Sequence, residues 1–581
     1  MQHTPLIPAS VFALGRVCIV LLLAVVTGCA QVPAGQDADV IVVGAGIAGL
    51  AAALEASANG SKVLVIEANS VGGGHAVKAG GLALVDTALQ RAKGIKDSPD
   101  LALQDLYRWG EDPDPHWARI YVDSSSTQVY DWLTNLGVQF AMVLDTPEDT
   151  VPRFHFTRGT AVNVVIPMLR KALADPNIRF VWNTRVTEFV KINDSIRGVH
   201  SVNERTGYRR EWRARATVLA TGGFESNLAM VRENWPADQV LPKKLYRGAG
   251  YYAVGDGYRL AEFAGAQLRN MDRQEIFYSG IPDPRAPAGE RALYAENPAA
   301  IWLGPNGRRF MNEKTDSKTL AAAINKLEPM NYWLFFDQRG SRKLNIRDIN
   351  NQESAALRAE ILSNPKITIS APTLDELAAK AGLPAYGLRT TVETWNRMVS
   401  LGEDYQFERF SQADKPGTIA PISDPPYYAL RVYPLTRKSM GGPTINIYAQ
   451  VMSTADVPIP GLYAAGELTG VAGINGKHGG SGTFLGPSVL TGRVAGKSAA
   501  AAARLTVAEP VRYAQPAQPP EQIIAGRAFG QAGYWHYDAV HRLVTARGYT
   551  CDRCHSGNLA DQTSDKPEVM LTRLTTCTSC H

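Results

Sequence analysis

Cysteine is scarce in this chain of 581 residues: six occur, and none lies between Cys29 and Cys551. The long stretch between them can form no disulfide bond and offers no thiolate, so redox chemistry there requires a bound cofactor. Blocks of Lys or Arg are absent as well, and 60 basic against 55 acidic residues leave a net charge of only +5. Because a nucleic-acid surface needs clustered positive charge, no nucleic-acid partner is expected.

Long apolar runs are missing apart from one near the start, at 17–26, which follows a single charge, Arg16. Ten residues are too few for a helix that crosses a bilayer, which needs about 20. The pattern predicts a signal peptide at 1–29. Val26-Thr27-Gly28-Cys29 resembles the lipobox of bacterial lipoproteins. We therefore expect export to the periplasm, either as a lipoprotein anchored through Cys29 or after ordinary cleavage nearby.

The rest of the composition is that of a soluble α/β protein, with 45% hydrophobic and 20% charged residues, and the length corresponds to two to four domains. A strand, a glycine-rich turn, a helix and a second strand ending in an acid follow the leader. They are a strand at 39–43, the turn Gly44-Ala45-Gly46-Ile47-Ala48-Gly49, a helix at 50–58, a strand at 61–66, and Glu67. This order predicts a dinucleotide site for FAD or NAD.

Further motifs recur in a fixed order along the chain. They are Gly72-Gly73-Gly74-His75 through Gly80-Gly81, Leu219-Ala220-Thr221-Gly222-Gly223-Phe224, Gly255-Asp256-Gly257, Arg309-Phe310-Met311-Asn312-Glu313, and Pro460-Gly461-Leu462-Tyr463-Ala464-Ala465-Gly466-Glu467. Over about residues 37–505 the set resembles the flavoprotein superfamily of fumarate reductases, succinate dehydrogenases and 3-ketosteroid Δ1-dehydrogenases. The resemblance implies an α/β fold with a two-segment Rossmann-like FAD-binding domain at 37–240 and 421–505. An α+β cap domain at 241–420 is inserted between the segments.

The resemblance also implies which residues hold FAD: Gly44, Gly46, Gly49, Glu67, Gly73, Gly74, Gly81, Ala220, Gly222, Asp256, Glu467 and Leu485. In succinate dehydrogenases a histidine six residues before the double glycine bonds covalently to FAD. His75 lies five residues before Gly80. We therefore expect noncovalent FAD, with His75 as a polar residue near the ring.

The carboxyl-terminal part differs in composition, with a Pro-rich linker at 506–525 followed by a small, mostly irregular or helical tail at 526–581. The tail contains Cys551-Asp552-Arg553-Cys554-His555 and Cys577-Thr578-Ser579-Cys580-His581. Each is a CxxCH, in which two thiols form thioethers to haem and the histidine binds iron. Two CxxC pairs are also compatible with a zinc site. The adjacent histidines and the predicted export favour a dihaem cytochrome c tail.

Second axial ligands for the two irons are sought in the same tail. His536 and His541 are the only other histidines there, so four histidines could serve two irons. Met570 is the alternative ligand if one of these histidines is a surface residue.

The segments that bind substrate in fumarate reductases are altered here, although positive charge is retained. The expected histidine pair is replaced by Arg437 and Lys438, and the second arginine by Lys477 and His478. For the acid arginine the candidates are Arg339 and Arg342. Glu313 is kept from the proton-delivery segment, whereas Asp316 and Ser317 stand where its arginine partner is expected.

The steroid dehydrogenases offer a second template, on which His478 and the Gly482 amide would bind a ketone oxygen and Tyr251 or Tyr252 would be the base. The gathered cations favour an anionic or strongly polar substrate with a carbonyl or carboxylate. We therefore expect an FAD enzyme that reduces an activated C=C bond through two haems. Its redox partner would be a membrane quinol oxidase-type donor or a soluble cytochrome. The alternatives are a ketosteroid-type dehydrogenase that sends electrons outward, and a noncatalytic electron-transfer module.

The tail generates the first testable prediction. Mature protein made where cytochrome maturation operates should absorb in the Soret region, because each CxxCH motif would carry a covalent haem. Absorbance spectra of the purified protein, before and after reduction, check this. A protein without a Soret band, or a tail that holds zinc, contradicts the haem assignment.

Overall fold

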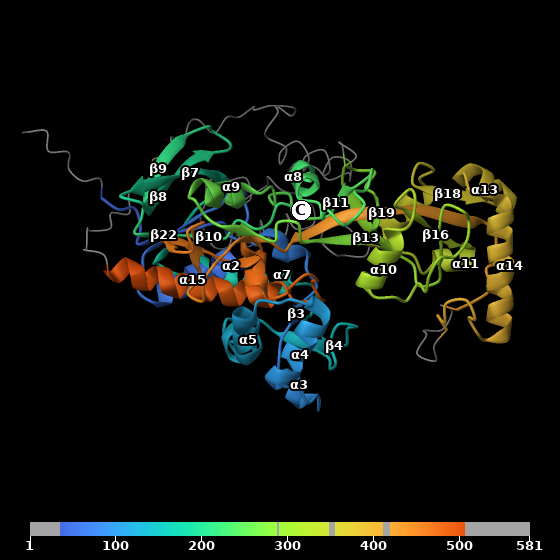
Figure 1. Cartoon of the computed structure of the whole chain (residues 1–581), viewed down its shortest axis with the longest axis horizontal. Coiled ribbons are helices and arrows are strands. Elements are labelled where there is room, and N and C mark those ends of the chain that lie inside the picture. Colours follow the sequence, from blue (N-terminus) through green and yellow to red (C-terminus); the bar gives the residue numbers. More distant parts are fainter. Residues whose placement is uncertain (1–34, 287–289, 348–354, 411–418, 506–581) are drawn as a thin grey trace, which may run out of the picture.

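The computed structural model describes residues 35–286, 290–347, 355–410 and 419–505. A parallel sheet with its helices occupies one end of this region, and a second, mostly antiparallel sheet with helices occupies the other (Figure 1). The predicted signal peptide, the linker and the haem motifs lie outside the described residues. Within the described ranges, no helix is both long enough and apolar enough to cross a membrane.

The sheet nearest the amino terminus has six strands, of which the inner ones are parallel. Their order is β21 (Gln450–Met452), β22 (Pro458–Ala464), β10 (Ala216–Leu219), β1 (Val40–Val43), β2 (Val63–Ile66) and β6 (Ile178–Val181). All residues of β1, β2 and β10 are buried, as expected for strands covered on both faces. The strands predicted at 39–43 and 61–66 are therefore present, and a ligand site is expected at their carboxyl ends.

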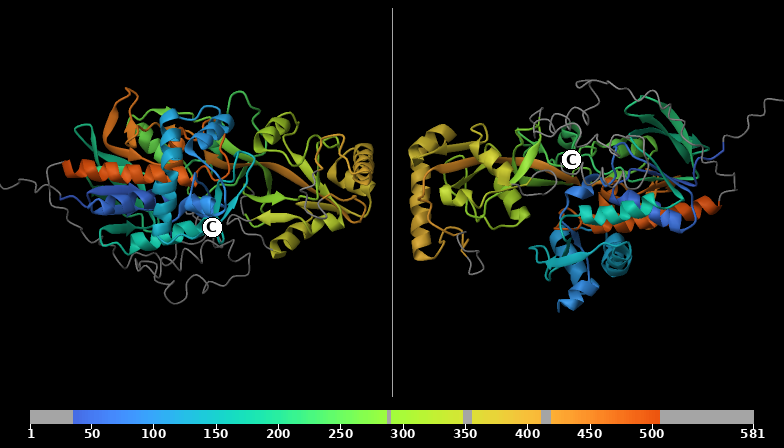
Figure 2. Two further views of the ribbon diagram at one scale, coloured as in Figure 1. Left: turned by 90° about the horizontal axis from the view of Figure 1, so that it is seen from below. Right: turned by 180° about the vertical axis from the view of Figure 1, so that it is seen from behind.

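Three helices cover this sheet: α2 (Ile47–Ala58), α7 (Val162–Leu173) and α15 (Leu485–Leu505) (Figure 2). α2 and α15 approach each other closely because α15 has glycine at the contact. A Cβ atom at Gly492 would lie 2.3 Å from the Ala48 carbonyl oxygen, and one at Gly496 would lie 2.2 Å from that of Ala52. This packing places the first residue of α15, Leu485, beside the glycine-rich turn.

Smaller elements surround the parallel sheet. One antiparallel sheet comprises β7 (Thr184–Ile192), β8 (Ser195–Asn203) and β9 (Arg209–Arg213). A lobe contains α3 (Ala88–Ala92), α4 (Pro99–Gly110), α5 (Pro115–Ser124) and α6 (Trp132–Asn135), with a sheet of β3 (Leu82–Ala83), β5 (Phe154–Thr157) and β4 (Phe140–Leu144). Alternation along β5 buries His155 and Thr157 and leaves Phe154 and Phe156 partly exposed on the opposite face.

The second large sheet forms the cap. Its strands are β11 (Tyr246–Arg247), β13 (Gln274–Pro282), β14 (Ala292–Glu296), β15 (Ile301–Leu303), β16 (Tyr332–Phe336), β17 (Asn345–Arg347), β18 (Thr368–Ala371) and β19 (Tyr427–Ser439). The helices beside it are α10 (Ser317–Ile324), α12 (Ala355–Ser363), α13 (Leu374–Ala381) and α14 (Ala385–Leu401). Separate hydrophobic cores lie under these helices, so the cap has an interior of its own.

Strand β19 joins the two ends of the molecule. It pairs antiparallel with β13, β16 and β18 in the cap, although the sequence boundary at 421 assigned its residues to the second FAD segment. The boundary at 421 comes from the resemblance to the superfamily. In the structure, β19 is one uninterrupted strand that is hydrogen-bonded to strands of the cap. Thirteen extended residues span about 40 Å. The last residues of β19, including Arg437 and Lys438, consequently lie between the cap and the parallel sheet.

A buried charged cluster anchors β5. The Arg153 side chain is 3% exposed and forms ion pairs with Asp97 (2.8 Å), Asp105 (2.6 Å) and Asp149 (2.9 Å). Burial alone would raise the pKa of Asp105, but hydrogen bonds, led by that from Arg153, bring it down to about 2. Because Arg153 directly precedes Phe154, the cluster fixes where the exposed face of β5 lies.

The cluster yields a stability prediction. Arg153→Met removes the cation from three buried or nearly buried carboxylates, so the free energy of unfolding at pH 7 should fall by about 3–5 kcal/mol. Urea-induced unfolding measures this. The matched control is Arg119→Met, which breaks ion pairs on the exposed face of α5 and should change the midpoint little. Equal losses in the two variants would show that the buried cluster is not the anchor.

Candidate functional site

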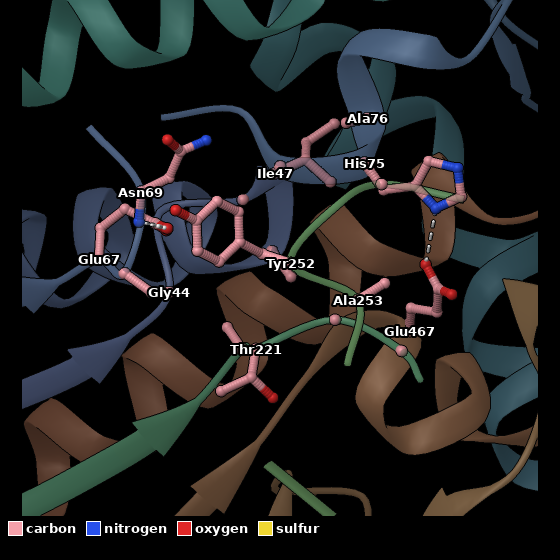
Figure 3. Close-up of a pocket in the computed structure, with 18 of the residues that line it drawn as sticks. Gly44, Ile47, Glu67, Asn69, His75, Ala76, Thr221, Tyr252, Ala253 and Glu467 are labelled. Atoms are coloured by element: carbon pink, nitrogen blue, oxygen red, sulfur yellow. Dashed lines mark hydrogen bonds and ion pairs between the residues drawn. The ribbon is translucent and has the colours of Figure 1, made fainter. Parts of the chain in front are cut away.

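A pocket lies at the carboxyl ends of β1 and β10, where the glycine-rich turn leads into α2 (Figure 3). Gly44 has φ +103°, and a Cβ atom there would lie 2.5 Å from the Ala220 carbonyl oxygen. At Gly49 a Cβ atom would lie 1.9 Å from the Gly44 carbonyl oxygen. Gly46 differs, because a Cβ atom there would point into open space in the pocket. Two glycines therefore allow the turn to pack, and the third keeps its backbone accessible.

Glu67 ends β2 at the edge of this pocket. One carboxylate oxygen accepts a hydrogen bond from the Ala45 amide (2.6 Å) and the other accepts one from the Asn69 amide (2.8 Å). Burial raises the pKa of Glu67, although these two amides oppose the shift. Carboxylate oxygen atoms held in this way retain lone pairs that can accept hydrogen bonds from a ribose hydroxyl.

Glu467 and His75 form a pair at the other end of the pocket. The His75 Nδ1 lies 3.5 Å from a Glu467 carboxylate oxygen, whose partner oxygen accepts from the Ser439 amide. Burial lowers the pKa of His75 to about 4, so the ring is neutral at pH 7. Glu225, fully buried nearby, has its pKa raised well above the ordinary value, first by burial and then by the charge of Glu467. Both causes favour the uncharged form of its carboxyl group.

Most residues that the sequence assigned to the cofactor come together here. The pocket is lined by Gly44, Gly46, Glu67, Gly74, Ala220, Gly222, Asp256, Glu467 and Leu485. Gly49 and Gly73 lie behind the lining and hold the turn, with the Gly73 amide donating to the Ala45 carbonyl. Gly81 instead lines a second, larger cavity beside this pocket, which is called the cleft below. Tyr252, considered above as a base, projects into the cofactor pocket (Figure 3). Neither it nor Tyr251 lines the cleft.

The donors and acceptors of this pocket fit FAD. The helix α2 directs its amino end at the pocket, which suits a pyrophosphate, and Glu67 stands where a ribose would be. Two buried polar atoms of the wall, His75 Nε2 and Thr221 Oγ1, have no hydrogen-bond partner among the described residues. Such atoms are expected where a polar ligand supplies the missing bond.

A second, larger cavity of about 1160 Å³ opens beside this pocket, between the parallel-sheet part and the cap. We call it the cleft. Six residues line both cavities: Lys78, Ala79, Arg437, Lys438, Phe484 and Leu485. The two cavities therefore meet at a junction that contains three cations. A ligand in the cleft and a cofactor in the pocket would be in reach of each other there.

The three cations of the junction have different partners. Lys78 is 3% exposed and donates to the Ala249 carbonyl (3.1 Å). Arg437 donates to the carbonyls of Gly248 and Lys78 and forms no ion pair with a carboxylate of the described chain. Burial lowers the pKa of Arg437. A partly buried guanidinium with only carbonyl partners is well suited to bind an anion.

Lys438 is partly neutralised. Its ammonium group lies 3.1 Å from a Glu275 carboxylate oxygen and 3.9 Å from the centre of the Phe484 ring. Sequence reasoning found Arg437 and Lys438 but missed Glu275 and Lys78. A signal for Lys78 existed, since it is the only lysine between the glycine runs at 72–74 and 80–81. Glu275 carries no motif, and only strand pairing brings it beside Lys438.

Lys477 and His478 do not reach the cleft, contrary to expectation. Both are partly exposed and lie 3.6 and 3.2 Å from the Glu111 carboxylate. The Lys477 amide donates to the Gly110 carbonyl (2.8 Å), which folds this loop back on the end of α4. The cleft wall begins only at Gly479 and includes Gly482, where φ is +78°. The Gly482 carbonyl accepts from the Ala83 amide.

Arg339 and Arg342 are also placed away from the cleft. Arg339 lies in α11 (Gln338–Ser341), its side chain is 47% exposed, and it donates to the Pro421 carbonyl. Arg342 follows α11 and is exposed. Neither lines either cavity. The reason is that β16 directs the chain towards the outer part of the cap, next to α14, before α11 begins (Figure 1).

Glu313 lies in the cleft wall and has arginine partners that the sequence did not reveal. Arg309 holds both of its oxygens at 2.8 Å, and Arg409 lies 3.2 Å from one of them. Arg309 also pairs with the buried Asp404. Arg409, like Glu313, lines the cleft. The expected partner position, Asp316, instead caps α10. No motif marks Arg409, which reaches Glu313 only through the fold of the cap.

Comparison with known proteins agrees with this geometry. Residues 39–485 match the family model described as FAD binding domain. The chain is 32% identical over 482 residues to an NADH:fumarate oxidoreductase of Klebsiella pneumoniae. That match covers 81% of this chain and 49% of the relative, so the chain spans about half of that protein's length.

Two further similarities cover more of the other protein. The chain is 31% identical over 544 residues to a KsdD-like steroid dehydrogenase of Mycolicibacterium smegmatis, covering 80% of this chain and 99% of the relative. Among solved structures, the open conformation of a flavocytochrome c3 fumarate reductase superposes with a TM-score of 0.66 at 28% identity. It covers 84% of this chain and 81% of that one.

The glycine-rich turn yields a binding prediction. In Gly46→Ala the new methyl group meets no protein atom within 4 Å but enters the pocket. The apoprotein should keep its melting temperature, whereas the Kd for FAD should rise at least about tenfold, or about 1.4 kcal/mol. Thermal unfolding and flavin fluorescence measure the two quantities. In Gly49→Ala, by contrast, the methyl group clashes with backbone, so stability itself should fall. Unchanged FAD affinity in Gly46→Ala would exclude this turn from the cofactor site.

Proposed function

Since the chain belongs to the FAD binding domain family and is an FAD-dependent oxidoreductase of the fumarate reductase and ketosteroid dehydrogenase type, we propose that it reduces an activated carbon–carbon double bond. The substrate carries a carboxylate or carbonyl next to that bond. The observation behind this proposal is the junction, where three cations line both the cofactor pocket and the cleft. Positive charge at this place stabilises the negative charge that develops when an alkene accepts a hydride.

Each residue of the junction has a task in this reaction. FAD, when bound and reduced, supplies the hydride. Arg437 and Lys438 hold the carboxylate or carbonyl oxygen, and Lys78 adds positive charge from the cofactor side. Phe484 and Leu485 exclude water from the space between the two ligands, which strengthens these electrostatic interactions.

The proton comes from the cap side of the cleft. Glu313 accepts hydrogen bonds from Arg309 and faces the cleft together with Arg409. Burial lowers the pKa of Arg409, so its guanidinium releases a proton more readily than one in water does. We assign proton delivery to the Glu313 and Arg409 pair, in place of the arginines that the sequence suggested at 339 and 342.

Two c-type haems attached to the motifs that end in His555 and His581 would carry electrons to the flavin, and His536 and His541 would be their second ligands. These residues lie outside the described part of the chain, so the support for this relay is the two CxxCH sequences. The apolar run and Cys29 support export to the periplasm and a lipid anchor. A membrane quinol oxidase-type donor or a soluble cytochrome would deliver the electrons.

One alternative is dehydrogenation of a ketosteroid-like substrate, with electrons leaving through the haems. The size of the cleft and the similarity to a KsdD-like steroid dehydrogenase favour it. Against it, His478, the expected ligand of the ketone, pairs with Glu111 outside the cleft. A neutral steroid would also leave the charge of Arg437 without an anionic partner.

The experiment uses anaerobic holoprotein and reduced methyl viologen as the electron donor. Viologen oxidation should start when an alkene acid or an enone is added and should be stoichiometric with the reduced product. Glu313→Gln should slow this turnover by about 10²–10⁴-fold, because it removes a proton-transfer group. Glu328→Gln, at an exposed carboxylate of the cap, is the control and should match the wild type. If no alkene reoxidises the viologen, the chain is a noncatalytic electron carrier.

A further inference from the structure

The cleft has a charged end and an aromatic wall, and the two adjoin. Phe154 and Phe156 project from β5 with ring centres 4.3 Å apart, and Phe484 lies under Lys438. Phe277 of the cap faces them from β13, with the Arg437 guanidinium 5.5 Å from its ring centre. Arg437, which forms no ion pair with a described carboxylate, therefore lies beside Phe277 and lines the same cleft as Phe154, Phe156 and Phe484.

Glycines on the backbone opposite make room for these rings. A Cβ atom at Gly80 would lie 2.9 Å from Phe156, one at Gly482 would lie 2.6 Å from Phe154, and one at Gly479 would lie 2.5 Å from Phe484. Any larger residue at these positions would push a ring out of place. The backbone thus leaves room for the aromatic wall, in which Phe154 and Phe156 are partly exposed and Phe484 is buried, and all three rings line the cleft.

A second anionic group of a substrate would find little free positive charge in the cleft. Arg347 pairs with Glu296 (3.0 Å) and Arg409 pairs with Glu313 (3.2 Å). Lys314, the remaining cation of the wall, is exposed, so water weakens any ion pair that it forms with a ligand. A dicarboxylate would therefore place its second charge near rings and neutralised ion pairs, which is costly. One anionic group and one flat apolar group fit the cleft better.

We propose that the substrate is an enoate with a single carboxylate and an aromatic ring on its β-carbon. This rests on the proposed function and specifies its substrate class. The carboxylate binds Arg437 and Lys438, and the ring lies among Phe154, Phe156 and Phe277 by aromatic stacking. In the reaction the carbon–carbon π bond breaks, a hydride from reduced FAD forms the C–H bond at the β-carbon, and a proton forms the one at the α-carbon. The substrate gains two electrons, which reduced methyl viologen replaces in the assay.

The test compares substrates that differ in one group, with holoprotein and reduced methyl viologen. Cinnamate has the ring and the carboxylate, benzylideneacetone has the same ring beside a ketone, and crotonate and fumarate lack the ring. We expect kcat/KM for cinnamate to exceed each of the others at least tenfold. Preference for fumarate or crotonate overturns the aryl requirement, and preference for the ketone overturns the carboxylate requirement. In both cases the proposed function stands. If the protein reduces none of these compounds, the proposed function itself is overturned.

Two variants separate the contributions, once their flavin content has been shown to equal that of the wild type. Arg437→Met should lower kcat/KM for cinnamate at least a hundredfold and that for benzylideneacetone by a much smaller factor, because a ketone oxygen carries no charge. Arg389→Met, at an exposed arginine of α14, is the matched control and should change neither. Phe156→Leu should raise the KM for cinnamate and leave crotonate unchanged. Equal losses of activity with cinnamate and benzylideneacetone in Arg437→Met, or with cinnamate and crotonate in Phe156→Leu, would contradict the proposed binding mode.

Discussion

Positive charge held at the meeting point of two cavities is the constraint on which the rest of this structure depends. Placing cations in a partly buried site costs free energy unless dipoles or anions compensate. Here backbone carbonyls compensate part of this cost for Arg437 and Lys78, and the Glu275 carboxylate compensates it for Lys438. Glu275 and Glu467 also act on Arg437 through their charges, but no carboxylate of the described chain forms an ion pair with it, so an anionic ligand can take that place. Burial raises the pKa of Glu225, which favours its uncharged form.

The scaffold around the junction brings distant parts of the chain to one place. Strand β19 extends from the cap and delivers Arg437 and Lys438, and the segment before β3, with Lys78 and Ala79, and the start of α15 meet it from the opposite side. Buried ion pairs stabilise the supports on both sides: Arg153 with its three aspartates under β5, and Arg309 with Glu313 and Asp404 in the cap. The charged clusters thus hold the aromatic wall and the proton-delivery pair in fixed relation to the cations.

Much of the cofactor pocket could be predicted from sequence because its parts are adjacent in the chain. The run from β1 through Gly44 to Glu67 is local: Gly44 and Gly49 have no room for a Cβ atom, and Gly46 leaves its backbone open to the pocket. The cleft was predicted less well. Arg339 and Lys477 have the expected residue type, but a helix start in one case and a loop folded on α4 in the other direct them to the surface. Glu275 and Arg409 have no signature, since their partners lie far away in sequence.

The sequence by itself indicated an α/β chain that binds a dinucleotide, because phosphate-binding turns require glycine at set positions. The resemblance of its ordered motifs to a flavoprotein superfamily implied that the dinucleotide is FAD. The sequence also predicted cations for the substrate site, of which Arg437 and Lys438 line the cleft. Only the tertiary structure decided which cations share the cleft, that aromatic rings adjoin them, and that Arg409 accompanies Glu313. Charge and ring type are properties of single residues, whereas proximity across the cleft depends on strand pairing between segments hundreds of residues apart.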